Sequence, residues 1–165
     1  TSGHYAALSL MGKSIFYLTS PIYFVFFPLI AYKKEKNEKL TNTLLLAAGL
    51  ITIVSVCLSF VYFLFPNIIL KVFFPANEYK VLASYLGPFS LYILVFSLAY
   101  LLNTYFLSAG KTSIYKVNLI TSLLMIVAIF LFHNSLFQII GILFSTSLLL
   151  LIFLFVYYYR QNERN

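Results

Sequence analysis

The order of apolar and polar residues divides the chain into five long hydrophobic runs joined by short polar connections. The runs cover approximately residues 5–32, 40–65, 81–109, 112–132 and 136–159. Most of them reach the ~20 residues that a helix needs to cross a hydrocarbon core about 30 Å thick. They are continuous rather than alternating, which favours helices over a β-barrel, because helices satisfy their own backbone groups in lipid. The pattern predicts an all-α integral membrane protein, with about five transmembrane helices bundled in a single lobe over residues 1–165.

The connection at residues 66–80 (PNIILKVFFPANEYK) differs from the others because it is long and partly apolar. It is too short and too interrupted to cross a bilayer. Its apolar residues, together with Lys71 and two prolines, are typical of a segment that lies along a membrane surface. We therefore predict a short amphipathic helix over residues 68–74, at the outer face.

The composition of the chain supports a membrane protein, and the positions of its basic residues predict which end of the bundle faces the cytoplasm. The chain is 62% hydrophobic and only 9% charged, whereas soluble domains carry about a quarter charged residues. A net charge of +7 would suggest nucleic acid in a soluble chain, but here the bases flank the apolar runs. Lys71 and Lys80 lie on one side of a five-helix path, and eight bases lie on the other: Lys33, Lys34, Lys36, Lys39, Lys111, Lys116, Arg160 and Arg164. The positive-inside rule then predicts a multi-pass plasma-membrane protein with a cytoplasmic C-terminus and no nucleic-acid partner.

The first hydrophobic run carries the strongest candidate site. Four polar side chains are spaced i, i+4, i+8 and i+11, on one helical stripe: Ser9, Lys13, Tyr17 and Ser20. A charge within a span costs about 2.5–3.5 kcal/mol on insertion scales, so it usually faces a cavity or a partner. We predict that this stripe lines a hydrated cavity in which Lys13 attracts an anion, and that Pro21 and Pro28 kink the helix around it. In the alternative interpretation, Lys13 reaches out to the lipid headgroups.

Other polar residues within the runs are weaker candidates. Asn103 is assigned to the cavity, but it belongs to a set that interhelical hydrogen bonds would explain equally well: Asn103, Thr104, Asn118, Thr121 and Ser122. Pro88, after Gly87, predicts a kink in the third run. The spans contain no acid, and the chain has no phosphate loop, no metal-spaced His and Cys residues and no nucleophile–base pair. We expect no catalytic activity, no cofactor and no metal.

Four stretches and a short basic loop resemble the C-terminal lobe of the polysaccharide flippases, which export O-antigen and exopolysaccharide precursors. The stretches are residues 3–7 (GHYAA) with 27–31 (FPLIA), residues 73–79 (FFPANEY), and residues 102–111 (LNTYFLSAGK). The flippases belong to a superfamily that also contains lipid II flippases and multidrug and toxin extrusion transporters. The resemblance covers nearly the whole chain.

The resemblance implies a fold, a substrate and a partner. Such flippases have twelve to fourteen spans in two lobes around a central cavity, and the five runs here would correspond to the eighth to twelfth. The chain would then be a fragment that requires the missing N-terminal lobe, and it begins at Thr1 rather than Met. The family holds the diphosphate of a lipid-linked oligosaccharide with cations, and Lys13 is the one basic residue placed to do so.

Three alternatives remain open at this level. A multidrug or cation antiporter of the same superfamily is disfavoured because the spans contain no acid. A membrane-bound glycan polymerase or acyltransferase would normally place a catalytic His, Asp or Arg in an outer loop, and those loops offer few such residues. A purely structural membrane subunit is the third. Membrane lipids are expected partners in every case.

Overall fold

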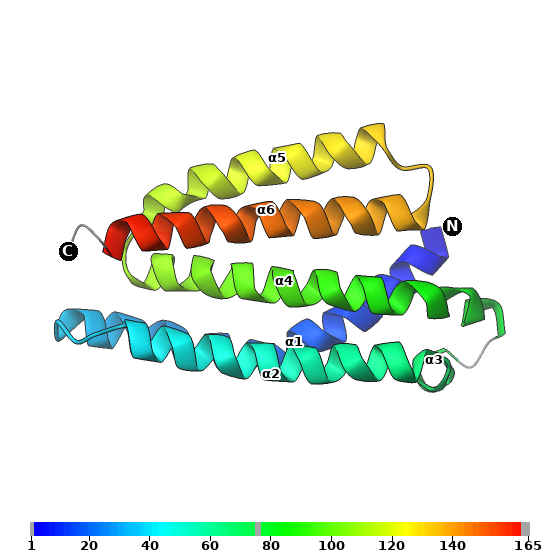
Figure 1. Ribbon diagram of the computed structural model, residues 1–165, viewed down its shortest axis with the longest axis horizontal. Helices are drawn as coiled ribbons and strands as arrows, with labels where there is room; N and C mark the ends of the chain where they lie inside the picture. The colour runs from blue at the N-terminus through cyan, green and yellow to red at the C-terminus, as the bar shows by residue number, and fades with distance from the viewer. Residues whose placement is uncertain (1, 75–76, 163–165) are drawn as a thin grey trace.

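The computed structural model describes residues 2–74 and 77–162, and over these residues the protein is an all-α membrane bundle without strands. The elements in chain order are α1 (Ser2–Glu35), α2 (Thr41–Leu64), α3 (Pro66–Phe73), the 3₁₀ turn η1 (Asn77–Leu82), α4 (Ala83–Ser108), the 3₁₀ turn η2 (Thr112–Ile114), α5 (Tyr115–Leu131) and α6 (Leu136–Asn162). Figure 1 shows the five long helices running along the bundle, with the short α3 turned across one end. The predicted fold class is confirmed.

The surface of the bundle is apolar along its length. Five of its helices are long and apolar enough to cross a membrane: α1, α2, α4 extended by the end of η1, α5 extended by η2, and α6. Large side chains such as Phe24, Val72 and Phe130 are about three-quarters exposed. Apolar patches of this extent are not tolerated on soluble monomers, which confirms that the protein is a multi-pass membrane protein.

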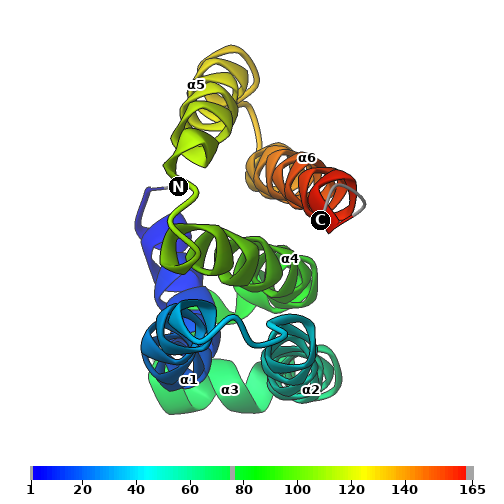
Figure 2. The same ribbon diagram turned by 90° about the vertical axis from the view of Figure 1, so that its left-hand side faces the viewer.

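Helix α4 is the centre of the bundle. It packs against α1, α2 and α6, whereas α5 packs mainly against α6. Figure 2 shows this arrangement from the end, with α4 between the pair α1–α2 below and the pair α5–α6 above. The central position explains why α4 buries the most residues, while α5 buries only Thr121.

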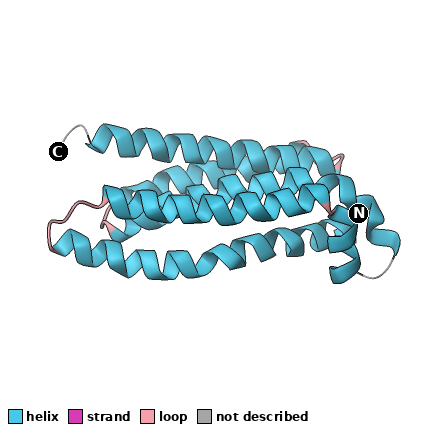
Figure 3. Ribbon diagram, turned by 60° about the horizontal axis from the view of Figure 1, so that its bottom comes forward, coloured by secondary structure: helices cyan, strands magenta, loops and turns pink. Residues whose placement is uncertain are grey.

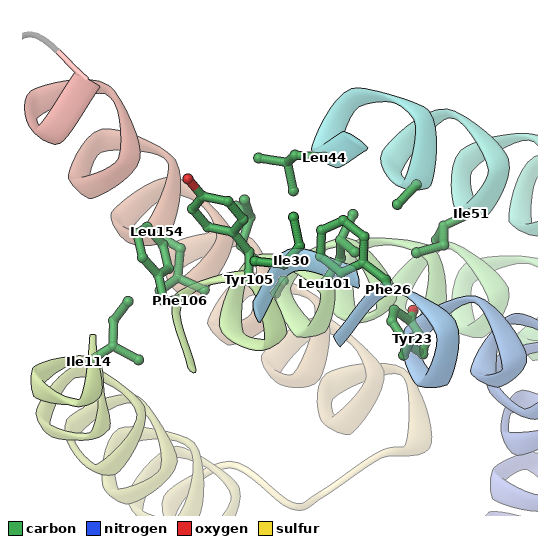
Figure 4. Packing of buried hydrophobic residues seen from close by; sticks show 13 residues of the cluster. Tyr23, Phe26, Ile30, Leu44, Ile51, Leu101, Tyr105, Phe106, Ile114 and Leu154 are labelled. Carbon is green, nitrogen blue, oxygen red and sulfur yellow. The ribbon is translucent and has the colours of Figure 1, made fainter. Parts of the chain in front are cut away.

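Two buried clusters hold α4 to its neighbours, one in each half of the bundle. The first includes Phe26 and Ile30 of α1 with Leu101 and Phe106 of α4, and Figure 4 shows these side chains meeting between the helices. The second includes Leu8 and Met11 of α1, with further residues from α2, α3, α4 and α6. In lipid, apolar burial does not drive helices together, so stability depends on how closely these side chains pack.

Two glycines permit close helix contacts. A Cβ atom at Gly12 of α1 would lie 2.2 Å from Cε1 of Phe89 in α4, and one at Gly87 of α4 would lie 2.6 Å from Cε1 of Phe63 in α2. In each case an aromatic ring of one helix lies against the bare backbone of another. Small residues at helix interfaces are the usual means of close packing in membranes.

One end of the bundle gathers the basic residues. Helices α1 and α4 both end there in a left-handed residue, Asn37 (φ 54°) and Gly110 (φ 71°) respectively. The same pair of backbone hydrogen bonds closes both ends; at α4, Lys111 N–H bonds Phe106 O at 2.8 Å and Gly110 N–H bonds Leu107 O at 2.9 Å. This is the Schellman arrangement, which satisfies the last carbonyl groups of a helix.

We call this end of the bundle the basic end. It is formed by the α1–α2 and α4–α5 connections and the last turns of α6, and Figures 1 and 3 show these segments together at the end where the C-terminus lies. Its described bases are Lys33, Lys34, Lys36, Lys39, Lys111, Lys116 and Arg160. Arg164, the eighth base of the charge count, lies outside the described residues.

The opposite end carries the N-terminus, α3, η1 and the α5–α6 turn (Figure 1). Helix α3 occupies the first half of the segment predicted to lie along the membrane surface. It buries Leu70 and exposes Lys71, and it also exposes the apolar Ile68, Val72 and Phe73. Pro75 and Ala76 of that segment lie outside the described residues. Contact of α3 with a membrane surface stays a prediction.

Candidate functional site

Three of the predicted cavity residues line one pocket. Ser9, Lys13 and Tyr17 of α1 face a pocket of about 310 Å³, completed by Tyr5 and Phe16 of α1 and by Phe89, Tyr92, Ile93 and Phe96 of α4. The stripe arises because a helix brings every fourth residue to the same face. The Lys13 side chain is exposed, and among the described residues it has no hydrogen-bond or ion-pair partner.

A second pocket continues the first towards the basic end. Its volume is about 240 Å³, and it shares Tyr92 and Phe96 with the first pocket. Its polar lining comes from three helices: Asn103 of α4; Asn118, Thr121 and Ser122 of α5; and Thr146 and Ser147 of α6. We call the two pockets together the polar groove. Most of the neutral polar candidates from the sequence therefore lie along the same groove as Lys13.

Within the second pocket, the two asparagines hold α5 to α4. Asn118 Nδ2 donates to Asn103 Oδ1 at 2.8 Å, so the predicted interhelical hydrogen bond is present. Asn118 Oδ1 is buried without a partner among the described residues. Ser147 is 6% exposed, lines the pocket and also has no hydrogen-bond partner among those residues. The pocket therefore offers hydrogen-bonding groups that the protein itself leaves unused.

Aromatic rings form the floor of the polar groove. Phe89, Tyr92 and Phe96 follow one another along α4, with centroids 5.4 Å and 6.0 Å apart, and Phe16 of α1 packs against Phe96 at 5.7 Å. These rings were not among the predicted site residues. Their spacing of three and four residues was the available signal, because it puts them on one helical face. An aromatic floor beneath neutral polar walls suits a ligand that presents both C–H faces and hydroxyl groups.

Ser20, the fourth predicted cavity residue, lines neither pocket of the polar groove. Its hydroxyl donates to Tyr17 O at 2.8 Å. That carbonyl is the one that Pro21 leaves without a partner, because proline has no N–H to donate to the residue four positions earlier. The structure thus gives Ser20 the task of satisfying the backbone beside a proline. Helix α1 continues through both Pro21 and Pro28, and α4 continues through Pro88.

Lys13 lies close to the end of the bundle opposite the basic end. Tyr62 Oη donates to Met11 O at 3.1 Å, and Tyr62 is only two residues from the end of α2. Twenty residues separate Lys13 from Lys33 along α1, which is about 30 Å of helix. That length equals the thickness of the hydrocarbon core. Both interpretations of Lys13 therefore place its ammonium near one membrane surface, and they differ in whether the polar groove holds water and ligand.

The described residues contain no candidate metal site. Among the described residues, no three His, Cys, Asp or Glu side chains lie close enough together to hold a metal ion. His133 bonds only Phe130 O, at 2.9 Å, in the exposed α5–α6 turn. What the site offers is one cation, several neutral hydrogen-bonding groups and aromatic faces.

Comparisons with protein-family models, with curated proteins and with solved structures find no match to this chain.

Proposed function

We propose that this chain is one lobe of a two-lobed exporter of lipid-linked oligosaccharides, and that the polar groove forms its share of the substrate path. The observation that carries the proposal is the gathering of Lys13 and the neutral polar residues along one groove of an otherwise apolar bundle. Polar groups are costly in lipid, so a continuous polar surface facing lipid would be unstable. A second lobe, closing over the groove, would remove that cost.

The chemistry of the groove changes along its length in the way such a substrate requires. Near one membrane surface it offers the unpaired ammonium of Lys13, which suits the charge-assisted bonds that phosphate oxygens favour. Deeper, it offers neutral amides, hydroxyl groups and aromatic faces, which suit sugar rings. A diphosphate at the depth of Lys13 would lie level with the headgroups, while its lipid tail leaves sideways into the bilayer. The activity is transport, with no covalent step.

We also propose that the basic end faces the cytoplasm. The bases of the α1–α2 and α4–α5 connections and of α6 are all at this end, as the positive-inside rule requires of a cytoplasmic surface. A single cysteine at Asn37, in a protein with Cys57 replaced by serine, should resist a membrane-impermeant thiol reagent in intact cells and react after permeabilisation. A cysteine at Asn134, in the α5–α6 turn, is the control for the opposite surface and should react in intact cells. Labelling of the Asn37 site in intact cells would show that the basic end faces outward, which would contradict the proposed orientation.

The export function is tested by deleting the gene that encodes the chain. Lipid-linked oligosaccharide should then accumulate on the cytoplasmic leaflet while surface polysaccharide falls, and the wild-type gene should restore both. The readout is the quantity of each, measured by mass spectrometry of extracted lipids and by surface glycan staining. If neither quantity changes on deletion, the proposed function is wrong.

A further inference from the structure

A second groove runs along the opposite side of α4, between α2 and α6. Its volume is about 570 Å³, and its lining is almost wholly apolar: Leu44, Leu45 and Ala48 with Thr41 and Thr52 of α2, Leu98, Leu101 and Leu102 of α4, and Leu151, Ile152, Phe155, Val156 and Tyr158 of α6. We call it the apolar groove. Figure 2 shows α2 and α6 on the same side of the bundle, with α4 set back between them.

The length of the apolar groove matches one leaflet of a membrane. It extends along α2 from Thr41 to Thr52, which is about 16 Å of helix. Half of a hydrocarbon core about 30 Å thick is close to this length. The groove begins at the basic end and stops near the middle of the bundle. It therefore has the dimensions to hold the acyl chain of a lipid in the leaflet on the basic side.

The mouth of the apolar groove is polar. Tyr158 of α6 and Thr41 of α2 lie on either side of it, and Tyr158 Oη donates a long hydrogen bond to Thr41 Oγ1 at 3.4 Å, which leaves the Thr41 hydroxyl hydrogen free to donate. The hydroxyl of Thr52, at the far end, is already bonded to Ala48 O at 2.7 Å. The hydroxyl groups at the mouth are therefore the ones that can contact a lipid headgroup, where the acyl chain joins its glycerol.

Unneutralised bases flank this mouth. Lys39 precedes Thr41 by two residues, and Arg160 lies one helical turn after Val156 of the groove lining, on the same face of α6; both side chains are exposed. Within the described part of the chain, no acid pairs with any base at the basic end. Partial burial lowers the pKa of nearby Lys111, and the charge of Lys34 lowers it further, against an opposing effect of Tyr157. The seven described bases at this end thus outnumber its two described acids, Glu35 and Glu38, and none of them is held in an ion pair.

We propose that the apolar groove is a binding site for an anionic phospholipid, with one acyl chain between α2 and α6 and the headgroup held by Lys39 and Arg160. Basic clusters between transmembrane helices at a membrane surface are suited to anionic headgroups. Because α2 and α6 both pack on α4, the lipid would fill the space between two helices that share a neighbour. The inference does not depend on the proposed transport.

The test titrates the purified full-length protein in detergent with phosphatidylglycerol, and separately with phosphatidylcholine of the same acyl chains. Native mass spectrometry counts the lipids retained on the protein. We expect one retained lipid, with an affinity for phosphatidylglycerol on the order of tenfold higher. The double substitution Lys39→Gln, Arg160→Gln should remove this preference and leave phosphatidylcholine binding unchanged. Equal affinities of the unaltered protein for the two lipids would overturn the proposal.

Two matched pairs of variants separate a site from general attraction. Ala48→Phe places a ring in the apolar groove and should abolish retention of both lipids. Gly49→Phe is its control, because a Cβ at Gly49 meets nothing within 4 Å and the ring would point outward. Lys116→Gln, on exposed α5, removes one charge away from the groove and should have no effect, whereas Lys39→Gln alone removes one charge beside the groove and should weaken the preference. A loss of preference by Lys116→Gln equal to that of the double variant would show surface attraction only, and would also overturn the proposal.

Discussion

The polar groove and the apolar groove lie against the same central helix, yet they differ in every property that decides what they can hold. The polar groove presents Lys13, two asparagines and several hydroxyl groups over an aromatic floor. The apolar groove presents leucines and other aliphatic side chains along its length, with hydroxyl groups at its mouth and far end. One helix, α4, thus separates a surface that carries polar groups from a surface that is almost wholly apolar. All faces of α4 are apolar on average. The two sides therefore differ through a few individual residues and not through an overall amphipathic pattern.

The sharpest way to break this comparison is to measure which groove holds water. In a protein with Cys57 replaced by serine, a cysteine at Ser147 should react with a polar thiol reagent, because thiolate formation needs water. A cysteine at Ala48, in the apolar groove, should not react. Both positions lie within spanning helices, so depth alone does not separate them. The rates are followed by mass shift. Equal reaction at the two positions would remove the distinction between the grooves.

Removing the charge of Lys13 should have the next largest effect. Lys13→Ala and Lys13→Gln should lower export by about tenfold or more, because hydrogen bonds to charged groups contribute about 1.5–3 kcal/mol. Lys13→Arg should retain part of the activity. The measurement is surface polysaccharide, at equal amounts of protein in the membrane. If Lys13 only reaches the lipid headgroups, the Lys13→Gln protein should export normally. That result would contradict the assignment of Lys13 to the substrate path.

A smaller effect is expected at Gly12, beneath the polar groove. Gly12→Ala puts a Cβ 2.2 Å from the ring of Phe89, which must move, and overpacking of this kind costs about 1–3 kcal/mol. Phe89 lines the polar groove, so the displaced ring should also narrow it. Gly49→Ala on α2 is the matched control, because the added Cβ would have no atom within 4 Å. This substitution should leave the stability of the protein unchanged or raise it slightly. Thermal unfolding in detergent compares the two variants, and equal midpoints would contradict the close contact.

The smallest effect is expected from the hydrogen bond between Asn103 and Asn118. A double-mutant cycle with Asn103→Ala and Asn118→Ala should give a coupling of about 0.6 kcal/mol, and at most about 1.7 kcal/mol. The value is small because both amides find other partners when the helices separate. Unfolding in denaturing detergent supplies the four free energies. A coupling of zero would mean that the two helices are held without this bond.

Much of the fold could be predicted from the sequence because lipid imposes it. A run of about twenty apolar residues has few stable alternatives to a spanning helix, so the five long helices followed from hydropathy alone. The neighbour of each helix could not be predicted, because helices that are apolar on all sides carry no pattern that points to a partner. The central position of α4 and the apolar groove depend on those pairings, and neither was expected.

The candidate site was partly predictable for a similar reason. Ser9, Lys13 and Tyr17 were found because residues four apart share a face of one helix, which is a local property of α1. The joining of Asn103 to Asn118 is a property of two helices, and only the structure pairs these side chains. Ser20 fits the same stripe, but the carbonyl freed by Pro21 is a nearer partner for its hydroxyl. Local competition of this kind is invisible to a helical-wheel argument.

The loose attachment of α5 has a consequence for how the protein is made. Helices enter the membrane in chain order, so α1, α2 and α4 can associate before the last two are complete. Helix α5 buries a single residue and packs mainly against α6, so before α6 is present its main described attachment to α4 is the hydrogen bond between Asn118 and Asn103. Most of its packing forms when α6 follows and docks on α4. The α5 wall of the polar groove is therefore the last part of the lobe to be assembled, and a ribosome that stops before α6 would release a chain that lacks this wall.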